Sequence, residues 1–178
     1  MMYLNHPIFS ALKAVEGTVL PYSGVELIKG TQELFLGGQE PYLPFGRMVC
    51  RSLNKPNIIV LPSPDNQRVI GVSAFSERHL TTVFRDAIVH GVEPLQAVPV
   101  LAKGLIYLRT ETEISERAKL FIRFQDNDTP NKHEAVGRIR TGNDNQNAFE
   151  LTPGTYAVRG SVYEGNLVPV EFDFSPLL

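Results

Sequence analysis

The chain has 178 residues, of which 43% are hydrophobic and 20% are charged, enough for one domain with a real core. Its formal net charge of −2 gives no electrostatic indication of a nucleic-acid partner. No apolar run is long enough to cross a bilayer, and the N-terminus lacks the basic start of a signal peptide. The single cysteine excludes an internal disulfide framework and fits a reducing, intracellular site of synthesis.

The first 24 residues differ from the rest and predict a short amphipathic arm. Asn5 and Pro7 mark a helix start, and Gly17 and Pro21 end the apolar pattern. Two interpretations stay open, because the arm either packs on its own domain or docks on a partner. The apolar residues in question are Tyr3, Leu4, Ile8, Phe9, Leu12 and Val15.

From residue 25 onward, short β-branched and aromatic segments recur at intervals of roughly ten residues between turns rich in glycine and proline. We expect a hairpin over residues 25–36, a turn between 47–53 and 57–62, a turn at Lys103–Gly104, and a closing pair formed by 155–165 and 167–174. The pattern predicts a mainly β fold with little helix, a jelly-roll-like sandwich or barrel spanning residues 25–178, behind an arm of residues 1–24.

One segment is ambiguous between helix and strand. In residues 76–91, Ser76 is a suitable helix cap, and Leu80, Val83, Phe84 and Ala87 have helical spacing. The two threonines and two valines weaken a helix. The segment is therefore expected to be either the one helix of the body or an extended element.

Motifs for catalysis and metal binding are absent or incomplete. The sequence has no phosphate-binding glycine loop and no nucleophile elbow. His133 begins a zinc-helix pattern, but Gly137 stands where the second histidine is needed. In the acidic loop 126–134, Pro130 occupies a position where a calcium loop needs a ligand, so we do not expect this loop to bind calcium. Cys50 has no base in a motif near it, and we interpret it as a small buried hydrophobe. We expect no catalysis, no cofactor and no metal.

Arginines beside the predicted strands are the stronger indication of function. On a strand, Arg47 and Arg51 share one face with Val49, opposite Met48 and Cys50. That face is either solvated or pairs with carboxylates across a protein interface, where arginine is enriched. Arginines recur on other predicted strands, where we expect them to be half-exposed: Arg109, Arg123, Arg138, Arg140 and Arg159.

Four motifs occur in an order that is similar to one known family. They are "LPFGRMV" at 43–49 after Gly38, "RVIGVSAF" at 68–75, "AVPVLAKGLIYL" at 97–108, and "YAVRGSVYEGNLVPVEF" at 156–172. This order resembles the tailed-phage capsid decoration proteins, also called structural cement proteins, over roughly residues 25 to 175. The longer stretch after "VIGVSAF" and the segment "ERAKLFIRF" depart from the family pattern.

The resemblance implies a non-catalytic protein on the outer surface of the phage head that bridges adjacent major capsid proteins. It implies a homo-oligomer, with a trimer favoured over a dimer. The expected capsid or subunit interface comprises Tyr3, Leu4, Ile8, Phe9, Leu12, Val15, Arg47 and Arg51.

Two alternatives stay open. One is another virion β-module, such as a head fibre or tail protein, that recognises host-surface glycans through an aromatic pocket supplied by Tyr107, Tyr156 and Tyr163. The other is a small β-barrel hydrolase or isomerase, for which the groups to test are Asp86, His79, His90 and Glu93.

Overall fold

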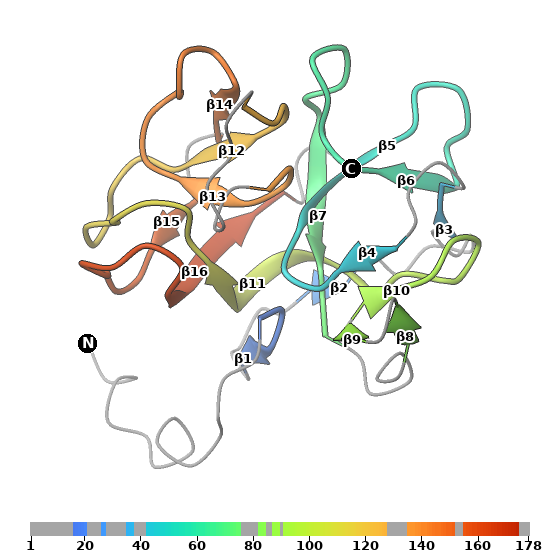
Figure 1. The fold of residues 1–178 in the computed structure, drawn as a ribbon, viewed down its shortest axis with the longest axis horizontal. Coiled ribbons are helices and arrows are strands. Elements are labelled where there is room, and N and C mark those ends of the chain that lie inside the picture. The colour runs from blue at the N-terminus through green and yellow to red at the C-terminus, as the bar shows by residue number, and fades with distance from the viewer. Residues whose placement is uncertain are drawn as a thin grey trace.

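A computed structural model describes residues 16–20, 26–27, 35–37, 42–75, 82–84, 87–89, 91–127, 135–151 and 155–174. These residues form strands and turns, and the predicted mainly β fold is confirmed (Figure 1). Within them, no helix has the length and apolar character that a membrane span requires.

The main sheet is built around one long strand, β11 (Val100–Arg109). The sheet runs in the order β15-β16-β11-β7-β5-β6-β3, and two short strands, β1 and β2, also pair with β11. Its pairs are antiparallel except for the parallel pair β3–β6. The other bounds are β1 (Val19–Leu20), β2 (Glu26–Leu27), β3 (Phe35–Leu36), β5 (Met48–Arg51), β6 (Ile58–Val60), β7 (Val69–Ser73), β15 (Tyr156–Ala157) and β16 (Leu167–Asp173).

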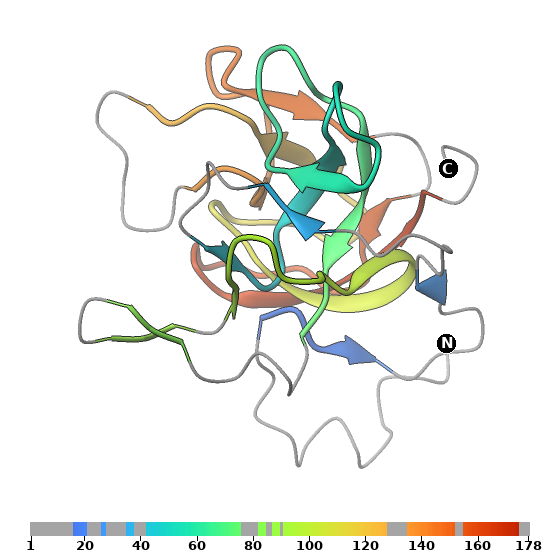
Figure 2. The same ribbon diagram turned by 90° about the vertical axis from the view of Figure 1, so that its right-hand side faces the viewer.

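Three smaller sheets surround this one. β12 (Phe121–Arg123) lies between β13 (Ile139–Arg140) and β14 (Ala148–Glu150), and Figure 1 shows this sheet beside β7, on the side away from the other two small sheets. β4 (Leu43–Pro44) pairs with β10 (Gly91–Val92). The hairpin of β8 (Thr82–Phe84) and β9 (Ala87–Val89) projects from the body in Figure 2.

The core has two parts because the middle of the main sheet is covered on both faces. On β5, Met48 and Cys50 belong to a large apolar cluster with the three-stranded sheet and β16, while Val49 belongs to a second cluster with Leu43 and Phe45. This split matches the predicted alternation of β5. On β16, alternate side chains from Val168 to Phe172 are buried, so this strand packs one face on the core.

Two predicted turns are wrong, and for residues 76–91 the extended alternative holds wherever the segment is described. The strands expected to form a hairpin over 25–36 pair elsewhere, β2 with β11 and β3 with β6, because an isolated pair of two-residue strands is not stable alone. Lys103 and Gly104 do not make a turn, since β11 runs through them, and Gly104 (φ 142°) lets the strand bend. The described parts of 76–91 are extended in β8, β9 and β10, as their β-branched residues favour.

The other two predicted pairs are confirmed. β5 runs antiparallel to β6, and β15 runs antiparallel to β16. The division into an arm of residues 1–24 and a body of 25–178 stays a prediction, because residues 1–15 and 21–25 lie outside the described part. The piece of the expected arm that is described, residues 16–20, contains β1 and pairs with β11.

Candidate functional site

Arg47 lies inside the molecule, directly before β5. Its residue is 6% exposed, and its backbone amide donates to the hydroxyl of Ser73 at 2.9 Å. Burial lowers the pKa of Arg47 to about 10, while the charge of Glu16 acts in the opposite direction. The Nη1 atom lies 3.8 Å from Oε1 of Glu16. Arg47 was expected on a solvated face or at an interface, but so little of it is exposed that its placement makes it an internal brace instead.

Glu16 lies among three arginines. Besides Arg47, it faces Arg109 (Nε–Oε2 3.5 Å) and Arg138 (Nε–Oε1 4.0 Å). Burial lowers the pKa of Arg138, and the Glu16 charge partly offsets this. Arg109 also donates from Nη1 to the carbonyl of Gly165. We call this set the Glu16 cluster. It attaches Glu16, which belongs to the expected arm of residues 1–24, to the body of the protein.

Gly46, the glycine of "PFGR", leaves space for the side chain of Glu16 because it has no Cβ. A Cβ on Gly46 (φ 76°) would lie 2.4 Å from Cγ of Glu16, and one on Gly17 (φ 85°) would lie 2.7 Å from Cβ of Phe45. The Gly17 amide donates to Tyr107 O at 2.8 Å, and the Gly17 carbonyl accepts from the Phe75 amide at 2.7 Å. The motif is thus a structural corner, and Glu16 and Gly17 pack against it.

A second buried ionic network joins the three-stranded sheet to the end of β11. Arg123 is 0% exposed and donates from Nε to Glu111 Oε1 at 2.9 Å. Its Nη2 lies 2.7 Å from Oδ2 of Asp144, and Arg140 Nη1 lies 2.8 Å from the same oxygen. Burial raises the pKa of Glu111, against hydrogen bonds from Arg123 and the Ala135 amide. The expectation that Arg123 and Arg140 are half-exposed is therefore wrong, because both are buried with carboxylates.

Asp144 also anchors a strained loop between β13 and β14. Asp144, Asn145 and Gln146 are consecutive residues at φ 49°, 53° and 74°, a left-handed run that is costly for side chains other than glycine. The arginines that bind Asp144 secure the loop from within, and Asn147 donates to Asn127 Oδ1 at 2.6 Å. Asn145 and Gln146 are exposed on this fixed backbone.

Cys50 and Arg51 are neighbours with different surroundings. Cys50 is fully buried, and burial raises the pKa of its thiol to about 12, so the interpretation of Cys50 as a core hydrophobe is confirmed. Arg51 is half-buried and lines a cavity of about 610 Å³. Sequence reasoning had not identified this cavity, nor Arg68 beside it.

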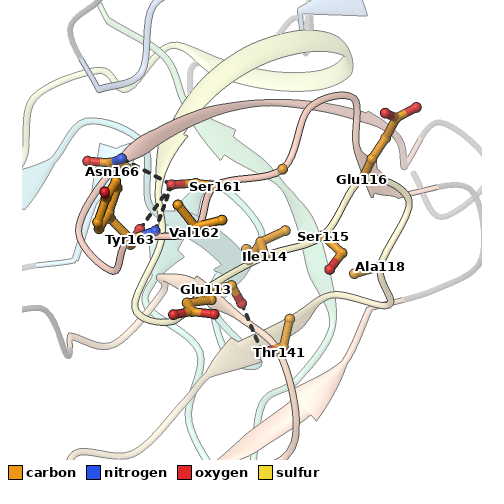
Figure 3. A pocket seen from close by; sticks show the side chains of 11 residues that line it. Glu113, Ile114, Ser115, Glu116, Ala118, Thr141, Ser161, Val162, Tyr163 and Asn166 are labelled. Atoms are coloured by element: carbon orange, nitrogen blue, oxygen red, sulfur yellow. Dashed lines mark hydrogen bonds between the residues drawn. The ribbon is translucent and has the colours of Figure 1, made fainter.

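A larger, more open cavity of about 800 Å³ lies on a different part of the surface (Figure 3). Val162 and Tyr163 at its rim are 68% and 69% exposed. Asn166 donates to the Ser161 hydroxyl at 3.0 Å, and the Thr141 hydroxyl donates to the Glu113 carbonyl at 3.2 Å. Of the tyrosines considered for an aromatic pocket, Tyr163 lines this cavity, and Tyr156 instead donates its hydroxyl to Glu171 at 2.6 Å.

Several sequence-based candidates lie outside the described residues. The arm residues Tyr3, Leu4, Ile8, Phe9, Leu12 and Val15 are among them, so their docking stays a prediction. The same holds for His79, His90, Asp86 and His133. Among the residues that are described, no group of three or more histidine, cysteine or acidic side chains is placed to hold a metal ion.

Comparison with known proteins gives a likeness of fold. No family model matches the sequence, and no curated protein matches it. One similar solved structure is a chain described as "The capsid of Myoviridae Phage XM1", with a TM-score of 0.60 and 15% sequence identity. The similarity covers 92% of this chain and 95% of that chain, so the two share one fold over nearly their whole lengths.

Proposed function

We propose that this chain is a capsid cement protein, which binds the outer surface of an assembled phage head and bridges adjacent major capsid proteins without catalysing a reaction. The observation that carries the proposal is the fold shared, over 92% of this chain, with a chain of a phage capsid. The ordered motifs that resemble decoration proteins point independently to the same role. Because each chain covers most of the other, the two are also close in length.

In this role the protein would stabilise the shell by adding contact area at each junction between capsid subunits. A standard protein interface buries about 1,600 Å² in total, and the symmetry of the shell repeats it many times. A protein that binds the assembled shell better than its free subunits favours the assembled state by mass action. A closed homo-oligomer, with a trimer favoured over a dimer, suits a local symmetry axis of such a shell.

Co-sedimentation tests this proposal. The purified chain is mixed with shells assembled from the major capsid protein of the same phage, and bound protein is measured against total protein. We expect saturable binding at a fixed ratio to the capsid protein and a higher melting temperature of the decorated shells. Wild-type protein that stays in the supernatant at all shell concentrations would overturn the proposal.

One observation favours a second candidate, a virion module that binds host-surface glycans. The 800 Å³ cavity joins the exposed ring of Tyr163 to polar groups of Glu113, Glu116 and Asn166, and sugar rings bind to surfaces that combine an aromatic face with hydrogen-bonding groups. A glycan array separates the candidates. If the protein binds specific glycans and Tyr163→Ala abolishes this binding, the second role is supported. If the array shows no binding, the glycan-binding role is wrong.

A further inference from the structure

Arg51 and Arg68 are neighbours at the end of the pairing between β5 and β7. Cys50 pairs with Val69 at the end of this ladder, so that Arg51, the next residue of β5, and Arg68, the residue before β7, both line the 610 Å³ cavity. Arg51 is half-buried and Arg68 is exposed. Like charges on neighbouring strands destabilise a sheet unless a partner neutralises them.

The described residues supply no such partner. In the described part of the chain, the guanidinium groups of Arg51 and Arg68 form no ion pair and no hydrogen bond, and the side-chain amide of Asn66 donates only to the Arg51 carbonyl. Glu150 also lines the cavity, but its Oε1 lies 3.0 Å from Nζ of Lys119, so its charge is already matched. Among the described residues that line the cavity, positive charge is therefore in excess.

The floor of the same cavity is apolar. Phe174 and Leu151 are 1% and 6% exposed, and Phe149 packs beside them. At the rim, Leu53 is 68% exposed and adds a further apolar side chain to the cavity. Apolar side chains flanked by unpaired arginines are the composition found at the centre of protein interfaces.

We propose that this cavity, lined by Arg51, Leu53, Arg68, Phe149, Leu151 and Phe174, receives a segment of the capsid protein in which an apolar side chain lies beside a carboxylate. The inference rests on the proposed cement function and names its contact site. The apolar side chain fills the floor, and the carboxylate lies between the two guanidinium groups. The apolar floor favours a protein segment over a phosphate-rich partner, which would leave Leu53 and Phe149 without apolar contacts.

The test compares exposed residues at the cavity with equally exposed residues elsewhere, in the full chain and with shells of the major capsid protein. Arg68→Glu and Leu53→Ser change the cavity. Arg159→Glu and Leu95→Ser are the matched controls, since Arg159 is exposed and Leu95 is 71% exposed. We expect Arg68→Glu and Leu53→Ser each to weaken shell binding by about tenfold or more, with melting temperatures and binding by the controls unchanged. Arg68→Lys keeps the charge and should retain most of the binding.

Each other outcome has a definite meaning. If wild type binds shells and both cavity variants bind equally well, this inference is wrong and the cement proposal stands. If wild type itself does not bind shells, both proposals fail. If the cavity variants bind shells normally but change the oligomeric state in sedimentation velocity, the occupant is a second copy of this chain, which overturns the assignment to a capsid segment.

Discussion

The guanidinium of Arg47 reaches Glu16 from the start of β5, so the corner at Phe45–Gly46 brings a charge into the interior. A buried charge is tolerated where an opposite charge lies near it, and removing one member of such a pair leaves the other uncompensated. Glu16 has two further arginines, Arg109 and Arg138, within 4.0 Å. These neighbours limit the loss when Arg47 alone is removed.

Arg47→Ala should lower the free energy of unfolding by about 2 kcal/mol, because it removes a buried side chain and one partner of Glu16. Arg51→Ala is the control, since Arg51 is half-buried and forms no ion pair with a described residue. The control should change stability by about 0.5 kcal/mol or less and instead weaken shell binding. Urea denaturation measures both. Equal stability of the two variants would show that Arg47 does not act as a brace.

Asp144→Asn should destabilise the protein in a pH-dependent way. Partial burial alone would raise the pKa of Asp144, but the hydrogen bond from Arg123 and the charge of Arg140 hold it below its ordinary value. A carboxylate with a lowered folded-state pKa contributes stability above its unfolded pKa of about 3.9, and this contribution is lost as the pH falls through the folded-state pKa. We expect a loss of about 2 kcal/mol at pH 7.

The measurement is thermal unfolding of wild type and variant from pH 7 to pH 2. The difference in melting temperature should be about 4–8 °C at pH 7 and should shrink below about pH 4. The exposed Asp126, changed to asparagine, is the control and should show a small difference at every pH. A difference for Asp144→Asn that is constant over this range would assign the effect to the shape of the loop rather than to its charge.

At the scale of single elements, the contact between β7 and β11 depends on the absence of a side chain at Gly71. A Cβ there would lie 2.4 Å from the carbonyl oxygen of Leu101 and 2.7 Å from Cγ1 of Val100. Because the nearer atom belongs to the backbone, the strands would have to separate to admit a methyl group.

Gly71→Ala is therefore expected to lower stability by about 3 kcal/mol, at the upper end for overpacking. Gly142→Ala is the comparison, because a Cβ at Gly142 (φ 78°) meets nothing within 4 Å and costs only backbone strain of about 1 kcal/mol. Chemical denaturation of both variants gives the two values. A smaller loss at Gly71 than at Gly142 would show that the contact between β7 and β11 adapts easily.

Local patterns predicted the faces of β5 and two pairings between strands that are neighbours in sequence, but not the pairings between distant strands. Alternation along 47–51 placed Met48 and Cys50 opposite Val49, because successive side chains of a strand point to opposite faces, and the two sides belong to different core clusters. The pairing of β2 with β11 was not accessible, because a two-residue strand contains too little pattern to indicate which distant edge it joins.

The buried ionic groups were missed for a related reason. Arg123 follows Ile122 on β12, and no acidic residue lies on the same strand. The sequence of this strand therefore does not indicate which carboxylates pair with Arg123. Those partners are Glu111, twelve residues earlier, and Asp144, 21 residues later. Only the fold brings them together. An arginine in an otherwise apolar segment, as in "LFIRF", was the one available signal of burial.

At the scale of the whole molecule, the described N-terminal residues are part of the body. Val19 and Leu20 pair with Ile106 and Leu105 of β11, and Leu20 is 7% exposed. The Glu16 cluster and β1 together anchor the described part of the expected arm, residues 16–20, to the body. A role for the arm in docking therefore has to be tested without removing this anchor.

Two deletions separate docking from folding. Removing residues 1–15 leaves Glu16 and β1 in place, so the melting temperature should stay near that of the full chain while shell binding falls, if the arm docks on the capsid. Removing residues 1–20 also takes away Glu16, the Gly17 hydrogen bonds and the buried Leu20, and should cost about 3 kcal/mol or more. Circular dichroism melting and co-sedimentation with shells measure the two effects. If the variant without residues 1–15 binds shells fully, the arm does not dock on the capsid. If this variant melts at as low a temperature as the variant without residues 1–20, the arm packs on its own domain.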